Sequence, residues 1–189
     1  MPPIIKYSKE KILEVGLKMV REKGIDSVSA RNIAKELGCS ICPIFSCFEN
    51  MEVLKEELLK KMHELYDSFI SEGIKNSEKR FKGSGLAYIK FAKENKNYFK
   101  ALFMGKNNFS IDTLVKGEEN EKINKIICES SGLNKEDAFK LHKYNWIFVH
   151  GIAVMLATDY ADFSDEEISE MLTEEYIALL DKFKGDVRL

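Results

Sequence analysis

The 189-residue sequence lacks the features that mark membrane and secreted proteins. No apolar run approaches the roughly 20 residues that a membrane-spanning helix needs. The N-terminal residues MPPIIKYSKEK contain no apolar core of a signal peptide. Four cysteines without a disulfide-like spacing indicate a reducing compartment. We therefore expect a cytoplasmic protein that does not enter a membrane.

Catalytic and metal-binding motifs are also missing. The sequence contains no Gly-rich phosphate loop, no Ser/His/Asp order, and no paired His and carboxylate motif. Cys39, Cys42 and Cys47 form a C-x2-C-x4-C pattern, but no histidine lies near enough in sequence to complete four zinc ligands. We expect neither an enzyme nor a metal or cofactor site.

Neither sign of charge predominates in the chain as a whole, since the formal net charge is −2. It is unevenly distributed, however. Residues 1–50 hold eight Lys/Arg and six Asp/Glu, whereas the remainder holds 21 and 25. The positive balance of the N-terminal segment favours a nucleic-acid contact there.

Helix signals dominate what is present, and no strand-like alternation of useful length occurs. The sequence therefore predicts an all-α protein, with a three-helix DNA-binding domain at residues 1–50 and a helical-bundle domain for ligand binding and dimerisation at residues 51–189. A long helix at 51–72 bridges the two. Polar residues 73–85 are expected to form a loop between the two bodies, and residues 105–117 to be irregular. The other expected helices cover residues 9–23, 31–37, 41–47, two segments within 86–103, 118–131, 135–158 and 165–183.

The residues from Ser29 to Gly38 predict a short helix that ends in a sharp corner. Ser29 is a good N-cap, because its hydroxyl can accept a backbone N–H of the first turn. Ile33 lies on the inner face of the helix, and the small Ala34 permits a close crossing. Gly38 can take the left-handed conformation that commonly ends a helix.

A second short helix is expected at residues 41–47, with Ser40 as its cap and Pro43 in its first turn. Ile44 and Phe48 would face inward. Two short helices joined in this way form a helix-turn-helix, whose second helix enters the DNA major groove.

The stretch VSARNIAKELGCSICPIFSCFENMEVLKEELL, residues 28–59, resembles the DNA-binding region of TetR-type (tetracycline-repressor family) transcriptional regulators. LAYIKFAKENKNYFKALF, residues 86–103, resembles the segment that follows the fourth helix in many members. WIFVHG, residues 146–151, resembles a Trp…His-Gly signature of one large subset. The resemblance implies a homodimer in which the last two helices of each subunit form a four-helix interface. It also implies an effector cavity in the C-terminal domain.

The expected recognition helix departs from the family because it carries no charged residue, so it lacks the bidentate base contacts of Arg and Asn. In addition, Met51 replaces a Lys found in many members. Thymine methyl groups and a hydroxyl contact would then provide base readout, while lysine and arginine side chains would contact phosphates. The candidate DNA-binding residues are Ser29, Arg31, Lys35, Ser40, Ile41, Cys42, Pro43, Phe45, Ser46, Cys47 and Lys55.

Aromatic residues are dense in the expected C-terminal domain. Core packing is the first explanation of such a stripe, but the same rings could line a cavity for an apolar or aromatic ligand. The candidate ligand-binding residues are Tyr88, Phe91, Phe99, Phe103, Trp146 and His150. The other two histidines, His63 and His142, are expected on the surface or on a helix face.

These observations favour a homodimeric repressor that binds a palindromic double-stranded DNA operator and is released by a small apolar or aromatic effector. Two alternatives remain open at this point. The chain could be a helical protein-interaction module in which the helix-turn-helix no longer binds DNA. It could also be a thiol-based redox sensor, since a helix N-terminus favours the thiolate form of a cysteine such as Cys42.

Overall fold

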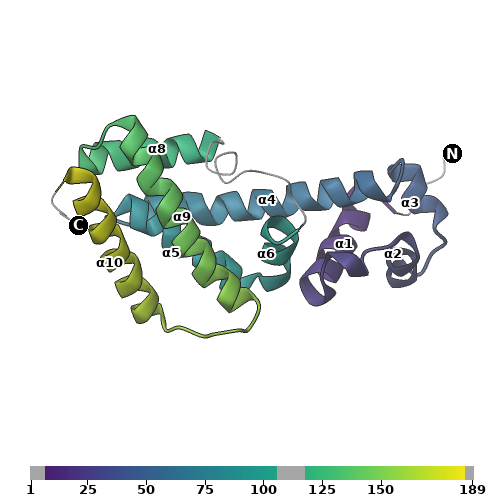
Figure 1. Cartoon of the computed structure of the whole chain (residues 1–189). Coiled ribbons are helices and arrows are strands. Elements are labelled where there is room, and N and C mark those ends of the chain that lie inside the picture. Colours follow the sequence, from purple (N-terminus) through teal and green to yellow (C-terminus); the bar gives the residue numbers. More distant parts are fainter. Residues whose placement is uncertain (1–6, 106–117, 186–189) are drawn as a thin grey trace. The chain divides into compact units, whose positions relative to one another are not determined.

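The computed structural model describes residues 7–105 and 118–185, and these residues form helices and no β-strand. The all-α prediction is therefore confirmed (Figure 1). None of the described helices is long and apolar enough to cross a membrane. From residue 106 to residue 117 the predicted irregular segment lies outside the described residues. The elements are α1 (Lys9–Lys23), η1 (Ile25–Ser27), α2 (Ala30–Leu37), α3 (Cys42–Cys47), α4 (Met51–Asn76), α5 (Arg80–Glu94), α6 (Lys96–Phe103), α8 (Glu118–Ser131), α9 (Lys135–Ala157) and α10 (Asp165–Lys184).

The chain divides into two compact units. Unit 1 contains the residues up to Tyr66 together with Asn95–Gly105, and unit 2 contains Asp67–Glu94 and the residues from 106 onward. Unit 1 thus holds α1, α2, α3 and α6, whereas unit 2 holds α5, α8, α9 and α10. Helix α4 contributes residues to both units.

Unit 1 is built around fully buried aliphatic side chains from four helices: Ile12 of α1, Ile33 of α2, Ile44 of α3 and Leu54 of α4. Helix α6 is fastened to α1 by polar contacts. The Tyr98 hydroxyl donates to the carbonyl oxygen of Leu17 at 3.0 Å, and the Asn97 amide donates to the carbonyl oxygen of Arg21 at 2.9 Å. These two hydrogen bonds hold α6 against α1.

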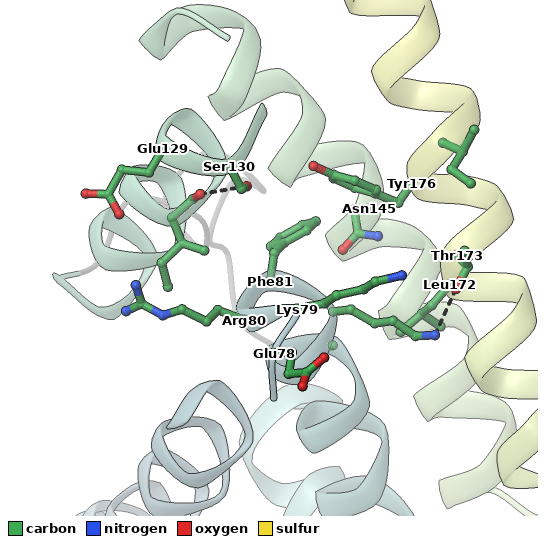
Figure 2. Close-up of a pocket in the computed structure, with 14 residues that line it drawn as sticks. Glu78, Lys79, Arg80, Phe81, Glu129, Ser130, Asn145, Leu172, Thr173 and Tyr176 are labelled. Carbon is green, nitrogen blue, oxygen red and sulfur yellow. Dashed lines mark hydrogen bonds between the residues drawn. The ribbon is translucent and has the colours of Figure 1, made fainter. Parts of the chain in front are cut away.

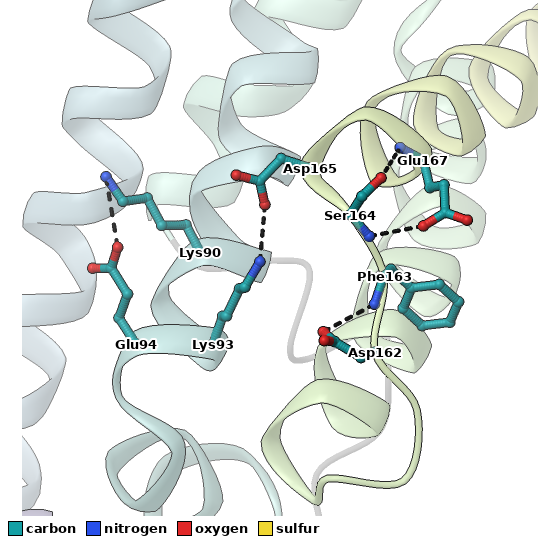
Figure 3. Close-up of polar contacts among 8 residues, drawn as sticks. All are labelled: Lys90, Lys93, Glu94, Asp162, Phe163, Ser164, Asp165 and Glu167. Atoms are coloured by element: carbon teal, nitrogen blue, oxygen red, sulfur yellow. Dashed lines mark hydrogen bonds and ion pairs between the residues drawn. The ribbon is translucent and has the colours of Figure 1, made fainter.

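Unit 2 has its own apolar core, to which α5, α8 and α9 contribute Phe81, Ile127 and Leu141. The N-terminus of α10 is held by a capping box, in which Ser164 and Glu167 exchange side-chain and backbone hydrogen bonds (Figure 3). Asn134 is the N-cap of α9, and Gly132, which has a positive φ, follows α8.

The predicted ends of α2 at Ser29 and Gly38 are confirmed, but the Ser40 cap is wrong. The N-cap of α3 is Ile41, which lies in the right-handed helical region and makes no side-chain cap bond. The backbone N–H groups of Ile44 and Phe45 both point to the Ile41 carbonyl oxygen, so the helix starts one residue later than predicted. Pro43 does lie in the first turn, and Ile44 and Phe48 are buried as predicted.

The predicted loop at residues 73–85 is also wrong, because α4 continues to Asn76 and α5 begins at Arg80. Its glycines serve helix packing. A Cβ atom added at Gly73 would lie 2.5 Å from the Cβ of Ala87, and one added at Gly83 would collide with the Gly73 carbonyl oxygen. At these two positions α4 and α5 approach so closely that only glycine fits. The glycines are therefore explained by the packing of the two helices and not by a flexible linker.

Candidate nucleic-acid interface

The corner between α2 and α3 is set by a serine that caps the start of α2 and a left-handed glycine that ends it. The Ser29 hydroxyl accepts the N–H of Asn32 at 3.2 Å and so caps α2. Gly38 adopts the left-handed conformation, with φ 67° and ψ 36°. Beyond it, the N–H of Cys39 donates to the Ala34 carbonyl oxygen at 2.9 Å. This arrangement ends α2 sharply and starts α3 four residues after Gly38.

Helix α3 is anchored by two inward side chains, since Ile44 is fully buried and Phe48 is 2% exposed. The ammonium of Lys9 lies 5.4 Å from the centre of the Phe48 ring. On the same side, the Cys47 thiol is half-buried and lies 3.9 Å from the Tyr7 carbonyl oxygen. The orientation of this short helix is therefore set by packing within unit 1.

The opposite face of α3 is exposed and unusually apolar. Ile41 and Phe45 are each 44% exposed and lie four residues apart, so they share one face. Cys42 and Ser46 are exposed beside them. The Ser46 hydroxyl donates to the Cys42 carbonyl oxygen at 2.9 Å, which leaves its oxygen lone pairs free to accept.

The remaining DNA-binding candidates lie around α3 in unit 1. Ser40, Arg31 and Lys35 are exposed, while Pro43 and Lys55 are half-buried. No described residue forms an ion pair with Arg31, Lys35 or Lys55.

One acidic side chain of α2, Glu36, forms an ion pair with a lysine of α1. Glu36 accepts a hydrogen bond from Lys18 at 2.9 Å, and this contact holds the pKa of the Glu36 carboxyl below its ordinary value. The same contact raises the pKa of Lys18. The Glu36 charge therefore opposes an approaching anion less than an unpaired carboxylate would.

The six candidate ligand residues do not gather in one place. Phe99 and Phe103 belong to unit 1, where their ring centres lie 5.2 Å apart. The others belong to unit 2. Phe91 is fully buried there and packs against Phe69 at 5.4 Å. Buried rings of this kind fill the core, as the packing interpretation expects.

Tyr88, Trp146 and His150 of unit 2 do come together. The Tyr88 hydroxyl and the His150 Nδ1 lie 2.9 Å apart, and the imidazole stacks on the Trp146 ring at 4.7 Å. Burial lowers the pKa of His150. The arrangement is a hydrogen-bonded, half-buried histidine with an aromatic partner.

A cavity of about 490 Å³ lies elsewhere in unit 2, between the residues that precede α5 and helices α5, α8, α9 and α10 (Figure 2). None of the six candidate residues lines it. Phe81, Leu172 and Tyr176 form part of its apolar wall, and Lys82 and Asn145 are among its polar lining. Sequence reasoning missed Phe81 and Lys82 because they fall inside the segment that was predicted to be a loop.

No protein-family model matches the chain, and no curated protein matches its sequence. Among the described residues, no group of three His, Cys, Asp or Glu side chains could hold a metal ion, and the four cysteines are free thiols.

A buried and a half-buried ionisable side chain of unit 2 have shifted pKa values. His142, predicted on the surface or on a helix face, is only 3% exposed, and burial lowers its pKa to about 4. Its Nδ1 lies 2.9 Å from the Asn124 amide oxygen, so Nδ1 carries the proton. Glu175 accepts a hydrogen bond from Asn145 at 2.6 Å, but burial is the larger effect and raises its pKa.

Proposed function

We propose that the chain is a DNA-binding transcriptional regulator of the TetR type, which acts as a repressor and responds to a small ligand. In this proposal α2, the corner at Gly38 and α3 form a helix-turn-helix, and α3 enters the major groove. The observation that supports it most is the orientation of α3. Ile44 and Phe48 anchor the helix from within, whereas Ile41 and Phe45 are presented outward.

Base readout in this proposal relies on apolar contact. Ile41 and Phe45 would meet thymine methyl groups, and Ser46 would accept a hydrogen bond from a base amino group. Arg31 and Lys35 of α2 and Lys55 of α4 would contact phosphates, since they have no ion-pair partner among the described residues. The proposal thus separates specificity, on α3, from electrostatic attraction, on its neighbours.

The regulator is proposed to act as a homodimer on a palindromic operator. Exposed large apolar side chains on the last two helices support an interface there: Tyr144 and Ile147 of α9 and Ile177 of α10 are each more than 40% exposed. Two α3 helices related by a twofold axis would meet successive major grooves about 34–36 Å apart.

Release from DNA is proposed to follow ligand binding in unit 2. A ligand can shift an equilibrium between two conformers only by its difference in affinity for them. Helix α4 contributes residues to both units, so it is the element through which such a shift would reach the DNA-binding residues.

A gel shift with the DNA upstream of the protein's own gene, repeated over a range of salt concentrations, tests the proposal. Three cationic side chains per subunit predict about six phosphate contacts per dimer, and therefore a slope of log K against log salt of about −5. Replacing Lys35 with Met should reduce the magnitude of that slope by about 2, since each dimer loses two contacts.

Lys90→Met is the matched control, because Lys90 is an exposed α5 residue of unit 2 that pairs with Glu94. It should leave the slope unchanged. A folded dimer that fails to shift DNA at low salt would contradict the proposal. That outcome would favour a helical protein-interaction module, a function that the uncharged, apolar face of α3 also suits.

A further inference from the structure

The cavity of about 490 Å³ in unit 2 has the size of a site for a small organic ligand. Its apolar side is aromatic. The rings of Phe81 and Tyr176 lie 5.5 Å apart and are tilted by 51°, and Figure 2 shows both at the pocket with Asn145 nearby. A planar ring placed against them would gain both apolar contact and aromatic edge interactions.

A cation lies beside this aromatic wall and lacks an anionic partner. The half-buried Lys82 ammonium donates to the Ser169 hydroxyl at 2.7 Å and to the Thr173 hydroxyl at 2.8 Å. An ammonium has three donors, so these two bonds leave one N–H to spare. No described carboxylate forms an ion pair with Lys82.

The rest of the rim carries charges of both signs. Lys79, Arg80 and Lys82 line the cavity together with two acids, Glu78 and Glu129. Figure 2 shows Arg80 extending on the side of Glu129, so these two opposite charges share one side of the pocket. Lys82 instead points to α10, where its partners are neutral hydroxyl oxygens.

We propose that this cavity binds an aromatic carboxylate, whose carboxylate accepts the remaining N–H of Lys82 while its ring packs against Phe81 and Tyr176. A charge-assisted hydrogen bond in a partly apolar site favours an anion over its neutral analogue. The binding site lies within unit 2 alone, whereas the role of its occupant as the effector rests on the proposed function. The site differs from the stripe of rings around Tyr88 and Trp146, which the sequence favoured.

Isothermal titration of the full chain with 2-naphthylacetate and with its neutral analogue 2-(2-naphthyl)ethanol tests the proposal. The acid should bind the wild type about tenfold or more tightly than the alcohol, since the alcohol oxygen carries no negative charge for the Lys82 ammonium to pair with. In Lys82→Met the affinity for the acid should fall to that of the alcohol, and the affinity for the alcohol should stay the same. Lys90→Met, on the same helix, should behave like the wild type.

A second pair of variants locates the ligand. Ser130 lines the cavity from α8 and is exposed, so Ser130→Trp should fill the space and abolish binding of the acid. Glu121→Trp adds the same ring at an exposed α8 position outside the lining and should leave binding intact. Circular dichroism confirms that each variant is folded.

Three results would overturn the proposal: no binding of the acid to the folded wild type, equal binding of acid and alcohol, or full binding by Lys82→Met. The DNA-binding experiments test the proposed function independently of the ligand site. If the acid binds through Lys82 but operator affinity is unchanged, the site stands and the effector role is wrong. If the chain binds no DNA, the proposed function is wrong, while the titration still decides the site.

Discussion

Replacing Phe45 with Glu should reduce DNA affinity by about 100-fold or more without unfolding the protein. Phe45 is 44% exposed on the outer face of α3, so its ring contributes little to the core of unit 1. In the proposed complex the change removes an apolar base contact from both half-sites, each worth about 1–3 kcal/mol. It also places a carboxylate in each phosphate-lined groove.

The measurement uses a duplex that the wild-type protein selects from a random-sequence pool, with binding followed by gel shift. Tyr160→Glu is the matched control, because it exchanges an aromatic side chain for a carboxylate at an 85% exposed position of unit 2. The free energy of unfolding should change by no more than about 0.5 kcal/mol in either variant, as is usual for exposed positions. Wild-type affinity in Phe45→Glu would show that this face of α3 does not contact DNA.

The stability of unit 2 should fall steeply as the pH drops from 7 to 4, and His142 should account for much of the loss. Burial lowers the pKa of this side chain to about 4 from an ordinary value of 6.5. The folded protein therefore holds a neutral imidazole where the unfolded chain binds a proton. The stabilisation is complete above pH 6.5 and is lost as the pH falls toward 4, for a total of about 3 kcal/mol.

Urea unfolding of wild type and His142→Asn at several pH values measures this contribution. Asparagine keeps an N–H donor for the Asn124 oxygen but does not titrate, so the variant should lose about 3 kcal/mol less than the wild type between pH 7 and 4. His63→Asn alters an exposed histidine of α4 and should retain the wild-type slope. Burial raises the pKa of Glu175, so this side chain favours the folded state as the pH falls, and it is present in all three proteins. Identical slopes in wild type and His142→Asn would contradict the assignment.

Features that depend on local chemistry could be predicted from the sequence. Ser29 accepts a backbone N–H at the start of α2, as predicted, and Ser8, Asn50 and Asn134 do the same at the starts of α1, α4 and α9. The left-handed Gly38 was predictable for the same reason. Such caps require only neighbours within a few residues, so no knowledge of the tertiary structure is needed.

Features that depend on distant neighbours were missed. The polar composition of residues 73–85 suggested a loop. The close approach of α4 and α5, for which Gly73 and Gly83 make room, is not visible in either segment alone. His142 was expected on the surface or on a helix face, but it is buried. Its spacing from Ala138, Leu141 and Asn145 places it within the buried stripe of α9, and that periodicity was a usable signal.

The candidate sites divide in the same way. The outward face of α3 followed from the spacing of Ile44 and Phe48, so its candidate DNA contacts could be named before the fold was known. The cavity in unit 2 could not. It requires Phe81 and Lys82 of α5 to lie beside Thr173 and Tyr176 of α10, about ninety residues later. No spacing rule links positions so far apart in sequence.

The central claim, that α3 lies against DNA, can be tested with a native reporter on its exposed face. Cys42 is exposed on α3, whereas Cys128 is half-buried in unit 2 and serves as an internal control. The measurement is the rate of alkylation of each cysteine by N-ethylmaleimide, read by peptide mass spectrometry with and without the selected duplex. With free duplex at ten times Kd, Cys42 should react about tenfold more slowly, because only unbound protein is accessible, and Cys128 should react at an unchanged rate. Undiminished alkylation of Cys42 in the bound protein would contradict the account.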